Sequence, residues 1–223
     1  DLICKGVKPK YYFISGSGNN KSFSPSNLIK ISKSLKQEQK KHGILLSGGD
    51  TVRSKKLSFT ITSIGFSKKI IFRNNAKIED DIYVTGNLGD SYAGLKILKN
   101  KITTSTNLKK YFVNKYYQPI LCCGLTKKLL TFANTSIDIS DGLISDLEKL
   151  INKQNFSYKL NLKRIPISKN LKKLIILKKL KKISFISQGD DYQVLFTADP
   201  AKSRIIQKTA KSLSINFFIC SSE

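Results

Sequence analysis

Residues 137–143 read IDISDGL, and within this stretch the hydrophobic period changes. In a strand alternate residues share a face, so Asp138 and Ser140 point one way while the two isoleucines point the other. From Asp141 onward apolar residues recur at helical spacing, at Leu143, Ile144, Leu147, Leu150 and Ile151. The stretch therefore predicts a strand over 136–140 that passes directly into a helix.

The two aspartates of this stretch need an explanation, because an ionised carboxylate among apolar residues is costly unless a cation meets it. Asp141 stands where a side chain can cap free helix N–H groups, and Gly142 lets the backbone approach a ligand. A helix N-terminus favours anions and carboxylates favour Mg²⁺, so a Mg²⁺–nucleotide complex suits both. The alternative is that Asp141 is only a cap and that Asp138 faces water.

Two further acidic segments also adjoin apolar strands. SGGDT at 47–51 follows a short apolar run; its paired glycines can expose N–H groups to a phosphate, and Asp50 could hold a metal. QGDDYQVLFT at 188–197 places adjacent acids before a strand. Taken singly, the first is equally well an ordinary Gly-Gly-Asp loop and the second a loop and a strand.

The remaining pattern mixes strands with helices. Strands are predicted over 10–15, 43–47, 57–62, 81–86, 192–197 and 215–220, and helices after Pro25, Asp90, Pro119 and Pro200. Ser24 and Gly43 are the expected caps of the first helix. No clean βαβ repeat is evident, which favours an α+β fold. The polar segment 68–80 is the expected domain boundary.

The charge of the chain invites a nucleic-acid interpretation. The 223 residues carry a formal net charge of +25, which suits a polyanionic partner. Only four of the 40 basic residues are arginines, however, and arginine is the residue that reads phosphates and bases bidentately. We interpret the run LKKLIILKKLKK at 171–182 as an amphipathic helix with solvated lysines, and we do not expect a nucleic-acid partner.

Other classes fit poorly. The four cysteines contain no C-x-x-C pair, so we expect reduced thiols in a cytoplasmic protein rather than a zinc site or disulfide scaffold. No apolar run reaches the ~20 residues of a membrane span. GSGNNKS at 16–22 lacks the glycine that a phosphate-binding loop needs before Lys-Ser, and His42 has no nucleophile motif around it. Because methionine is absent, we expect a fragment or a processed piece of a longer chain.

Five blocks, taken in chain order, resemble the thiamine-monophosphate kinase family of the aminoimidazole-ribonucleotide-synthetase-like superfamily. The first is similar to the family's Asp-Leu-Ala-Ala-Met-Gly-Ala-x-Pro, and Ile-Asp-Ile-Ser-Asp-Gly is specific to the family among its sister enzymes. The five blocks are DLICKGVKP at 1–9, LLSGGDTVRSKKLSFTITSIG at 45–65, RNNAKIEDDIYVTGNLGDSYAGLKIL at 73–98, SIDISDGLISDL at 136–147 and QGDDYQVLFT at 188–197.

The resemblance implies a two-domain α+β fold with a truncated N-terminal domain. Residues 1–72 would be the remainder of an N-terminal domain that binds ATP and metal and whose sheet builds a homodimer. Residues 73–223 would be an α+β C-terminal domain that is incomplete at its end. The implied activity is transfer of the γ-phosphoryl of ATP to thiamine monophosphate with Mg²⁺, by a direct in-line step in which positioning and electrostatics carry the catalysis.

The resemblance also implies roles for individual residues, although it assigns no catalytic side chain. Asp190 stands where the family has a glutamate that contacts thiamine. The implied Mg²⁺ ligands are Asp1, Asp50, Asp138 and Asp141, and the implied ATP contacts are Gly49, Asp50, Arg73 and Ser140. The chain departs from the family in lacking an earlier Gly-Asp-Asp motif and a tryptophan, in GSGNN at 16–20, and in Gln188 and the shortened Asp190.

Two alternatives stay open at this point. One is another ATP-using enzyme of the superfamily, such as selenophosphate synthetase or a hydrogenase-maturation factor, against which IDISDGL weighs. The other is a basic nucleic-acid-binding protein, which predicts clustered arginines and aromatic residues that the sequence does not show.

Overall fold

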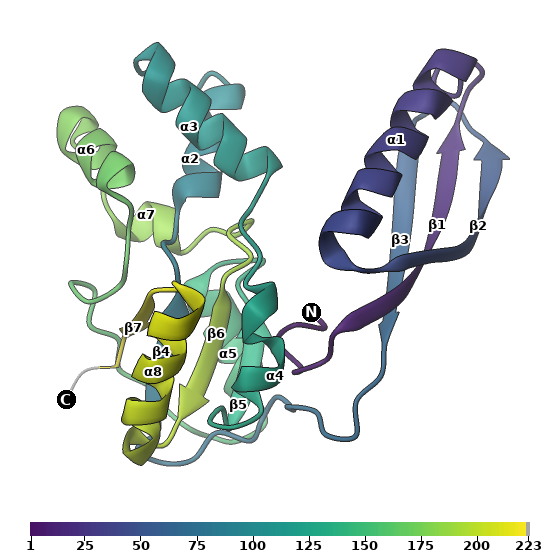
Figure 1. The fold of residues 1–223 in the computed structure, drawn as a ribbon. Coiled ribbons are helices and arrows are strands. Elements are labelled where there is room, and N and C mark those ends of the chain that lie inside the picture. The colour runs from purple at the N-terminus through teal and green to yellow at the C-terminus, as the bar shows by residue number, and fades with distance from the viewer. Residues whose placement is uncertain (222–223) are drawn as a thin grey trace. The chain divides into compact units, whose positions relative to one another are not determined.

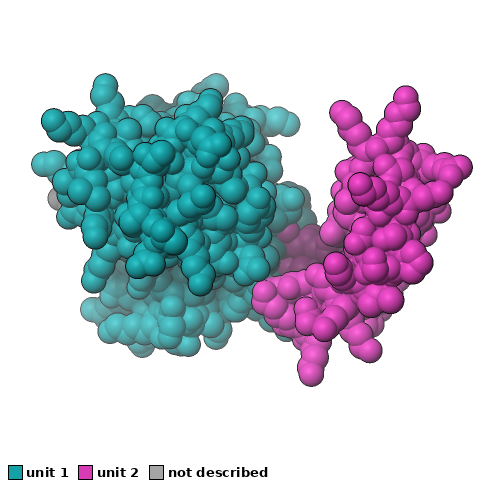
Figure 2. All heavy atoms as spheres, turned by 90° about the horizontal axis from the view of Figure 1, so that it is seen from above, with its two compact units in different colours: residues 1, 3–6, 69–223 teal, residues 2, 7–68 magenta. Residues whose placement is uncertain are grey.

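The computed structural model describes residues 1–221, and the chain forms two compact units, coloured separately in Figure 2. Unit 1 consists of Asp1, Ile3–Gly6 and the chain from Lys69 onward, and unit 2 of Leu2 and Val7–Lys68. Each unit contains its own β-sheet.

Unit 2 is a three-stranded sheet with one long helix, and its strand order is β2-β1-β3 (Figure 1). β1 runs parallel to β2 and antiparallel to β3. The elements are β1 (Pro9–Gly18), α1 (Pro25–His42), β2 (Leu45–Arg53) and β3 (Ser58–Gly65). α1 begins at the predicted proline and ends at Gly43, whose φ of 63° is the left-handed conformation expected of a C-cap. Ser24 occupies the N-cap position, but its side chain makes no capping hydrogen bond.

The predicted loop at GGDT is wrong, because these residues belong to β2. Gly49 pairs with Ile14 and Asp50 with Ser15 in the parallel ladder with β1. A Cβ atom on Gly49 would lie 1.8 Å from the carbonyl oxygen of Ile14, so the close approach of the two strands requires glycine there. The paired glycines therefore serve strand pairing in the structure.

Unit 1 is built on a four-stranded sheet of order β5-β6-β4-β7, in which every pairing is antiparallel. Its strands are β4 (Asp81–Thr85), β5 (Thr135–Asp138), β6 (Val194–Ala198) and β7 (Phe217–Ile219). Its helices are α2 (Asp90–Leu98), α3 (Thr106–Tyr117), α4 (Thr126–Leu129), α5 (Leu143–Ile151), α6 (Lys169–Lys178), α7 (Ile183–Ile186) and α8 (Ser203–Leu213), with short 3₁₀ turns η1 (Cys123–Leu125) and η2 (Pro200–Lys202). The predicted α+β class is confirmed.

Helices cover both faces of this sheet. On one face Ile82, Ile137 and Leu195 pack against the apolar stripe of α5, which includes Leu147 and Leu150. On the other face the aromatic rings of Tyr83, Phe196 and Phe132 pack with residues of α4 and α8. A third cluster joins α2, α3, α6 and α7. The sheet is thus a rigid platform for the loops at its ends.

Helix predictions were uneven. The helix predicted after Pro119 is only η1 followed by the one-turn α4, and α3 was not predicted at all. The amphipathic interpretation of 171–182 is confirmed up to Lys178, where α6 ends; the helix buries Leu171 and Leu174 and leaves lysines exposed, and 179–182 lie outside it. In the described part of the chain, no helix has the length and apolarity that a membrane crossing needs.

Candidate active site

The predicted switch from strand to helix at Asp141 is confirmed in outline: β5 ends at Asp138, α5 begins at Leu143, and residues 139–142 connect the two. Ile137 and Ile139 are buried in the core, while the side chain of Asp138 on the other face is 14% exposed. The amino nitrogen of Asp1 lies 3.8 Å from Asp138 Oδ1. Within unit 1 the chain start therefore meets the end of β5, and two of the predicted metal ligands are neighbours.

One cation, Lys5, lies near enough to Asp138 for their charges to interact. Lys5 Nζ lies 3.5 Å from the carbonyl oxygen of Ser136 in β5, and the N–H of Ile71 donates to the carbonyl of Lys5, 3.1 Å away. Partial burial, together with the nearby charge of Arg73, lowers the pKa of the Lys5 amine. Lys5 was missed by sequence reasoning, because nothing in a lysine-rich chain singled out this one.

The expectation that Asp141 caps the following helix is wrong. The buried carboxylate of Asp146 caps it instead: its Oδ2 accepts the N–H groups of Asp141 at 2.8 Å and Gly142 at 3.0 Å. The side chain of Asp141 is 64% exposed and binds the ammonium of Lys149, which also donates to Asp146 Oδ1 at 3.0 Å. Because Asp146 accepts the two N–H groups just before the helix, the Asp141 carboxylate is not needed there and lies exposed, where a ligand can reach it. An acid in the first turn of α5 was the signal for this cap.

The turn at 140–142 and the loop at 187–193 touch backbone to backbone. A Cβ atom on Gly189 would lie 1.7 Å from the carbonyl oxygen of Ser140, so only glycine fits. The N–H of Asp190 donates to that same oxygen at 3.0 Å, and the N–H of Tyr192 donates to the carbonyl of Ile139 at 2.9 Å. Asp190 is therefore held directly beside Ser140.

Tyr192 lies near two of the acidic side chains, those of Asp190 and Asp138. Its hydroxyl donates to Asp190 Oδ1 at 3.4 Å. Burial, and then the negative charges of Asp190 and Asp138, raise the pKa of the phenol. Tyr192 was not predicted, because a tyrosine at the start of an apolar strand is typical of core packing.

The predicted site residues are divided between the units. In unit 1, β5 and the turns next to it carry Asp1, Asp138, Ser140, Asp141 and Asp190. Gly49 and Asp50 lie in β2 of unit 2, where Asp50 is exposed and its Oδ1 accepts the N–H of Thr51 at 2.7 Å. Over residues 1–221, no three acidic, histidine or cysteine side chains are gathered as a metal cage. Carboxylates still suit Mg²⁺, which usually takes one or two of them together with substrate phosphates and water.

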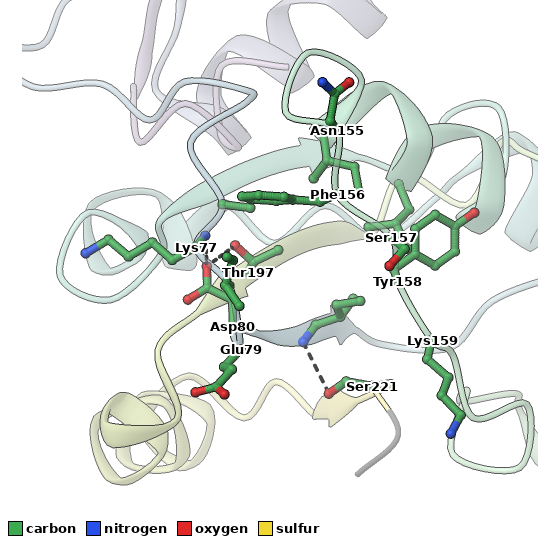
Figure 3. Close-up of a pocket in the computed structure, with 15 residues that line it drawn as sticks. Lys77, Glu79, Asp80, Asn155, Phe156, Ser157, Tyr158, Lys159, Thr197 and Ser221 are labelled. Atoms are coloured by element: carbon green, nitrogen blue, oxygen red, sulfur yellow. Dashed lines mark hydrogen bonds between the residues drawn. The ribbon is translucent and has the colours of Figure 1, made fainter.

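A cavity at the opposite end of the unit 1 sheet is a weaker candidate (Figure 3). It has a volume of about 420 Å³ and lies where Asp81 pairs with Ala198. Its central acid, Asp80, already accepts hydrogen bonds from the Thr197 hydroxyl at 2.7 Å, the Lys77 N–H at 2.9 Å and the side-chain amide of Asn134. Because these partners satisfy the carboxylate, we interpret Asp80 as structural.

The chain has the aminoimidazole-ribonucleotide-synthetase-like fold, which it shares with several solved structures. Over 99% of the chain and 71% of the other structure, it superposes with a TM-score of 0.89 and 25% identity on thiamine-monophosphate kinase from Stenotrophomonas maltophilia K279a. It shares its fold, at a TM-score of 0.87 and 23% identity, with a structure described as AaThiL complexed with AMPPCP and TMP, covering 99% of the chain and 69% of that structure. A hydrogenase maturation protein, HypE, shares the fold at a TM-score of 0.74 and 14% identity, over 98% of the chain and 69% of that structure.

Sequence comparison decides between these families. The chain is 35% identical over 223 residues to thiamine-monophosphate kinase of Buchnera aphidicola subsp. Acyrthosiphon pisum, which covers 97% of the chain and 67% of that relative. It is 31% identical to the Haemophilus influenzae enzyme of the same name, over 96% of the chain and 65% of that relative. No protein-family model matches. The chain belongs to the thiamine-monophosphate kinase family, as the resemblance predicted, and spans about two thirds of the length of these relatives.

Proposed function

We propose that the protein containing this chain transfers the γ-phosphoryl group of ATP to the phosphate of thiamine monophosphate, giving thiamine diphosphate and ADP. The relatives at 31–36% identity carry the name of this activity. A solved structure of the same fold is described as a complex with AMPPCP, an ATP analogue, and TMP.

One observation carries the proposal: Asp190 and Ser140 are adjacent, with the N–H of Asp190 3.0 Å from the carbonyl oxygen of Ser140. Ser140 is the proposed contact to ATP, and Asp190 is the proposed contact to thiamine. Direct transfer needs the donor and acceptor phosphates in one place, because the enzyme contributes mostly orientation and charge. The two rigidly joined turns supply that juxtaposition within unit 1.

The charged side chains have separate proposed roles, toward the phosphates, Mg²⁺ and the thiazolium ring. Arg73 and Lys5 would neutralise phosphate oxygens, because two dianionic groups repel each other as they approach. We assign Asp1, Asp50, Asp138 and Asp141 to Mg²⁺, which when bound supplies charge neutralisation and orientation for the phosphates. Asp190 would orient the cationic thiazolium ring, for which its carboxylate is a suitable partner. No side chain is proposed as a general base, because the attacking phosphate oxygen is already anionic.

We also propose that the protein is a cytoplasmic homodimer that uses unit 2 for assembly. Exposed apolar residues line the strands of this unit: Phe13, Leu45, Val52, Phe59 and Ile61 are 40–59% exposed. Such a surface is typical of an interface. The cysteines Cys4, Cys122 and Cys220 are free thiols, which suits a reducing compartment. Light scattering of the purified protein tests the dimer, and a monomer at micromolar concentration would contradict it.

The activity is tested by incubating the purified natural protein with thiamine monophosphate, Mg²⁺ and ATP labelled in its γ-phosphate. We expect label in thiamine diphosphate. Ser140→Ala should raise KM for ATP, and Asp190→Ala should raise KM for thiamine monophosphate with little change for ATP. Label that appears only in inorganic phosphate would refute the proposed acceptor, and a loss confined to ATP in Asp190→Ala would refute the role of Asp190.

A further inference from the structure

The loop that carries Asp190 is held in an unfavourable backbone conformation. Asp190 has a φ of 67° and Tyr192 a φ of 50°, both in the left-handed region that side chains with a Cβ rarely adopt. Such a conformation is unfavourable and persists only where the surroundings impose it. Asp191 lies between the two and is the residue that fastens the loop to the rest of unit 1.

The Asp191 side chain supplies the cap of α2, about a hundred residues away in sequence. The carboxylate is 5% exposed and accepts the N–H groups of Gly89 at 2.6 Å and Ser91 at 3.3 Å. The N-cap residue of α2 is Gly89, which has no side chain to bind these donors. Asp191 therefore satisfies two of the free N–H groups at the start of this helix.

The start of α2, to which Asp191 binds, is held in place by residues of other helices. Asp90, the first residue of α2, is also buried; its carboxylate accepts the hydroxyls of Ser168 at 2.6 Å and Tyr111 at 2.8 Å. Burial raises the pKa of Asp90, and Lys115 lies near enough to oppose that shift. The start of α2 is thus tied to α3 and to the N-cap of α6, so it does not follow the loop if the loop moves.

We propose that Asp191 is the positioning residue that locks the 189–192 loop against the Ser140 turn and so sets the affinity for thiamine monophosphate. The Asp191 carboxylate accepts a hydrogen bond from the start of α2, and the N–H groups of Asp190 and Tyr192 donate to the carbonyls of Ser140 and Ile139. Without the hydrogen bonds of Asp191, both strained residues relax and the Asp190 carboxylate leaves its place. This inference rests on the proposed contact between Asp190 and thiamine.

The test compares two hydrogen-bonded carboxylates at opposite ends of the unit 1 sheet. Asp191→Asn keeps the shape but replaces one acceptor oxygen by an NH₂ group, which cannot bind a backbone N–H. Asp80→Asn is the matched control, since it makes the same replacement in a carboxylate that also accepts a backbone N–H, far from the loop. Amide hydrogen exchange is measured at Asp190 and Tyr192, and the Kd values for thiamine monophosphate and AMPPCP are measured by calorimetry.

We expect exchange at Asp190 and Tyr192 to become ~10-fold faster in Asp191→Asn, and binding of thiamine monophosphate to weaken ~10-fold, with AMPPCP unchanged. Asp80→Asn should change neither. Unchanged exchange in Asp191→Asn, or equal effects of both variants, would overturn the positioning role. Faster exchange with unaltered thiamine monophosphate binding would instead refute the assignment of Asp190 to the substrate. If Asp191→Asn does not fold, Asp191→Ser, whose hydroxyl still accepts one N–H, is subject to the same criteria.

Discussion

The central strand β6 of unit 1 and the strand β2 of unit 2 are opposites. Every residue of β6 is buried, whereas every residue of β2 is exposed. β2 is the more polar of the two, yet both contain apolar side chains, and the burial of those apolar side chains is a further difference. It comes from what covers them: helices pack on both faces of the unit 1 sheet, while α1 buries none of its own side chains in unit 2.

This contrast shows which residues of the proposed site are held in place by the core of their own unit. Asp138, Ser140 and Asp190 stand at the end of a sheet with its own dense core, so unit 1 fixes their relative positions by itself. Asp50 stands on a sheet whose apolar surface lacks cover within its own unit. We infer that unit 2 needs a partner surface to become as rigid as unit 1.

The sharpest way to break this comparison is to truncate one leucine in each strand. Leu195 in β6 is fully buried, and Leu45 in β2 is 58% exposed. Leu195→Ala should lower the free energy of unfolding by about 2–5 kcal/mol, because it leaves a cavity in a packed core. Leu45→Ala should cost less than about 0.5 kcal/mol. Urea denaturation followed by circular dichroism measures both. Similar losses would show that the β2 face is covered in the protein.

A second prediction uses the pH dependence that burial gives to unit 1. Burial raises the pKa of Asp191 from 3.8 to about 7, against the opposing effect of the Gly89 and Ser91 N–H groups. The folded state therefore holds a proton that the unfolded state releases, and stability falls as the pH rises from about 4 to about 7. The shift corresponds to at most about 4 kcal/mol. In Asp191→Asn this part of the slope should vanish; parallel stability curves for both proteins would contradict the shift.

The sequence predicted what depends on local pattern. The change of period at Asp141 placed the end of β5 and the start of α5, and Pro25 and Gly43 bounded α1, because caps and periodicity are local properties. It failed where a distant segment decides. GGDT became a strand because β1 supplies its hydrogen-bond partners, and glycine is required there by the approach of Ile14.

Site residues divide in the same way. Asp138, Ser140 and Asp190 were identified by the resemblance, and the structure brings them together in unit 1. Asp191 was visible only as one of two adjacent acids, since its role depends on Gly89, which is remote in sequence. The capping role went to Asp146 rather than Asp141, because which of two nearby acids turns inward depends on the packing of α5.

A third prediction compares the proposed metal ligands of the two units. Asp141→Asn and Asp50→Asn each remove one carboxylate charge from exposed positions, so neither should disturb folding. If both act on Mg²⁺, each should lower kcat ~10²-fold, a typical loss for one electrostatic catalytic group. Activity should recover in part at raised Mg²⁺ concentration. If one variant keeps a near wild-type kcat while the other loses activity, the metal is bound only by the unit whose aspartate is needed for activity.

The smallest effect is expected from replacing one of two lysines that belong to different units. Lys5 belongs to unit 1 and Lys8, an exposed residue, to unit 2. The Lys5 amine is half-buried, lies 3.5 Å from the Ser136 carbonyl oxygen, at the outer limit of a hydrogen bond, and is repelled by Arg73. An anion with several charged oxygens would relieve this arrangement, so we expect Lys5 to bind a phosphate of ATP.

The variant Lys5→Met tests this with little structural risk, because the similar block of the family has methionine at this position. It should weaken AMPPCP binding about tenfold, the contribution of one charge-assisted contact. Lys8→Met removes the same charge three residues away and should leave the Kd unchanged, since its side chain is solvated. Calorimetry at two salt concentrations separates a direct contact from general attraction to a basic chain, because only the latter fades steeply with salt. Equal affinities of the two variants would show that Lys5 has no part in nucleotide binding.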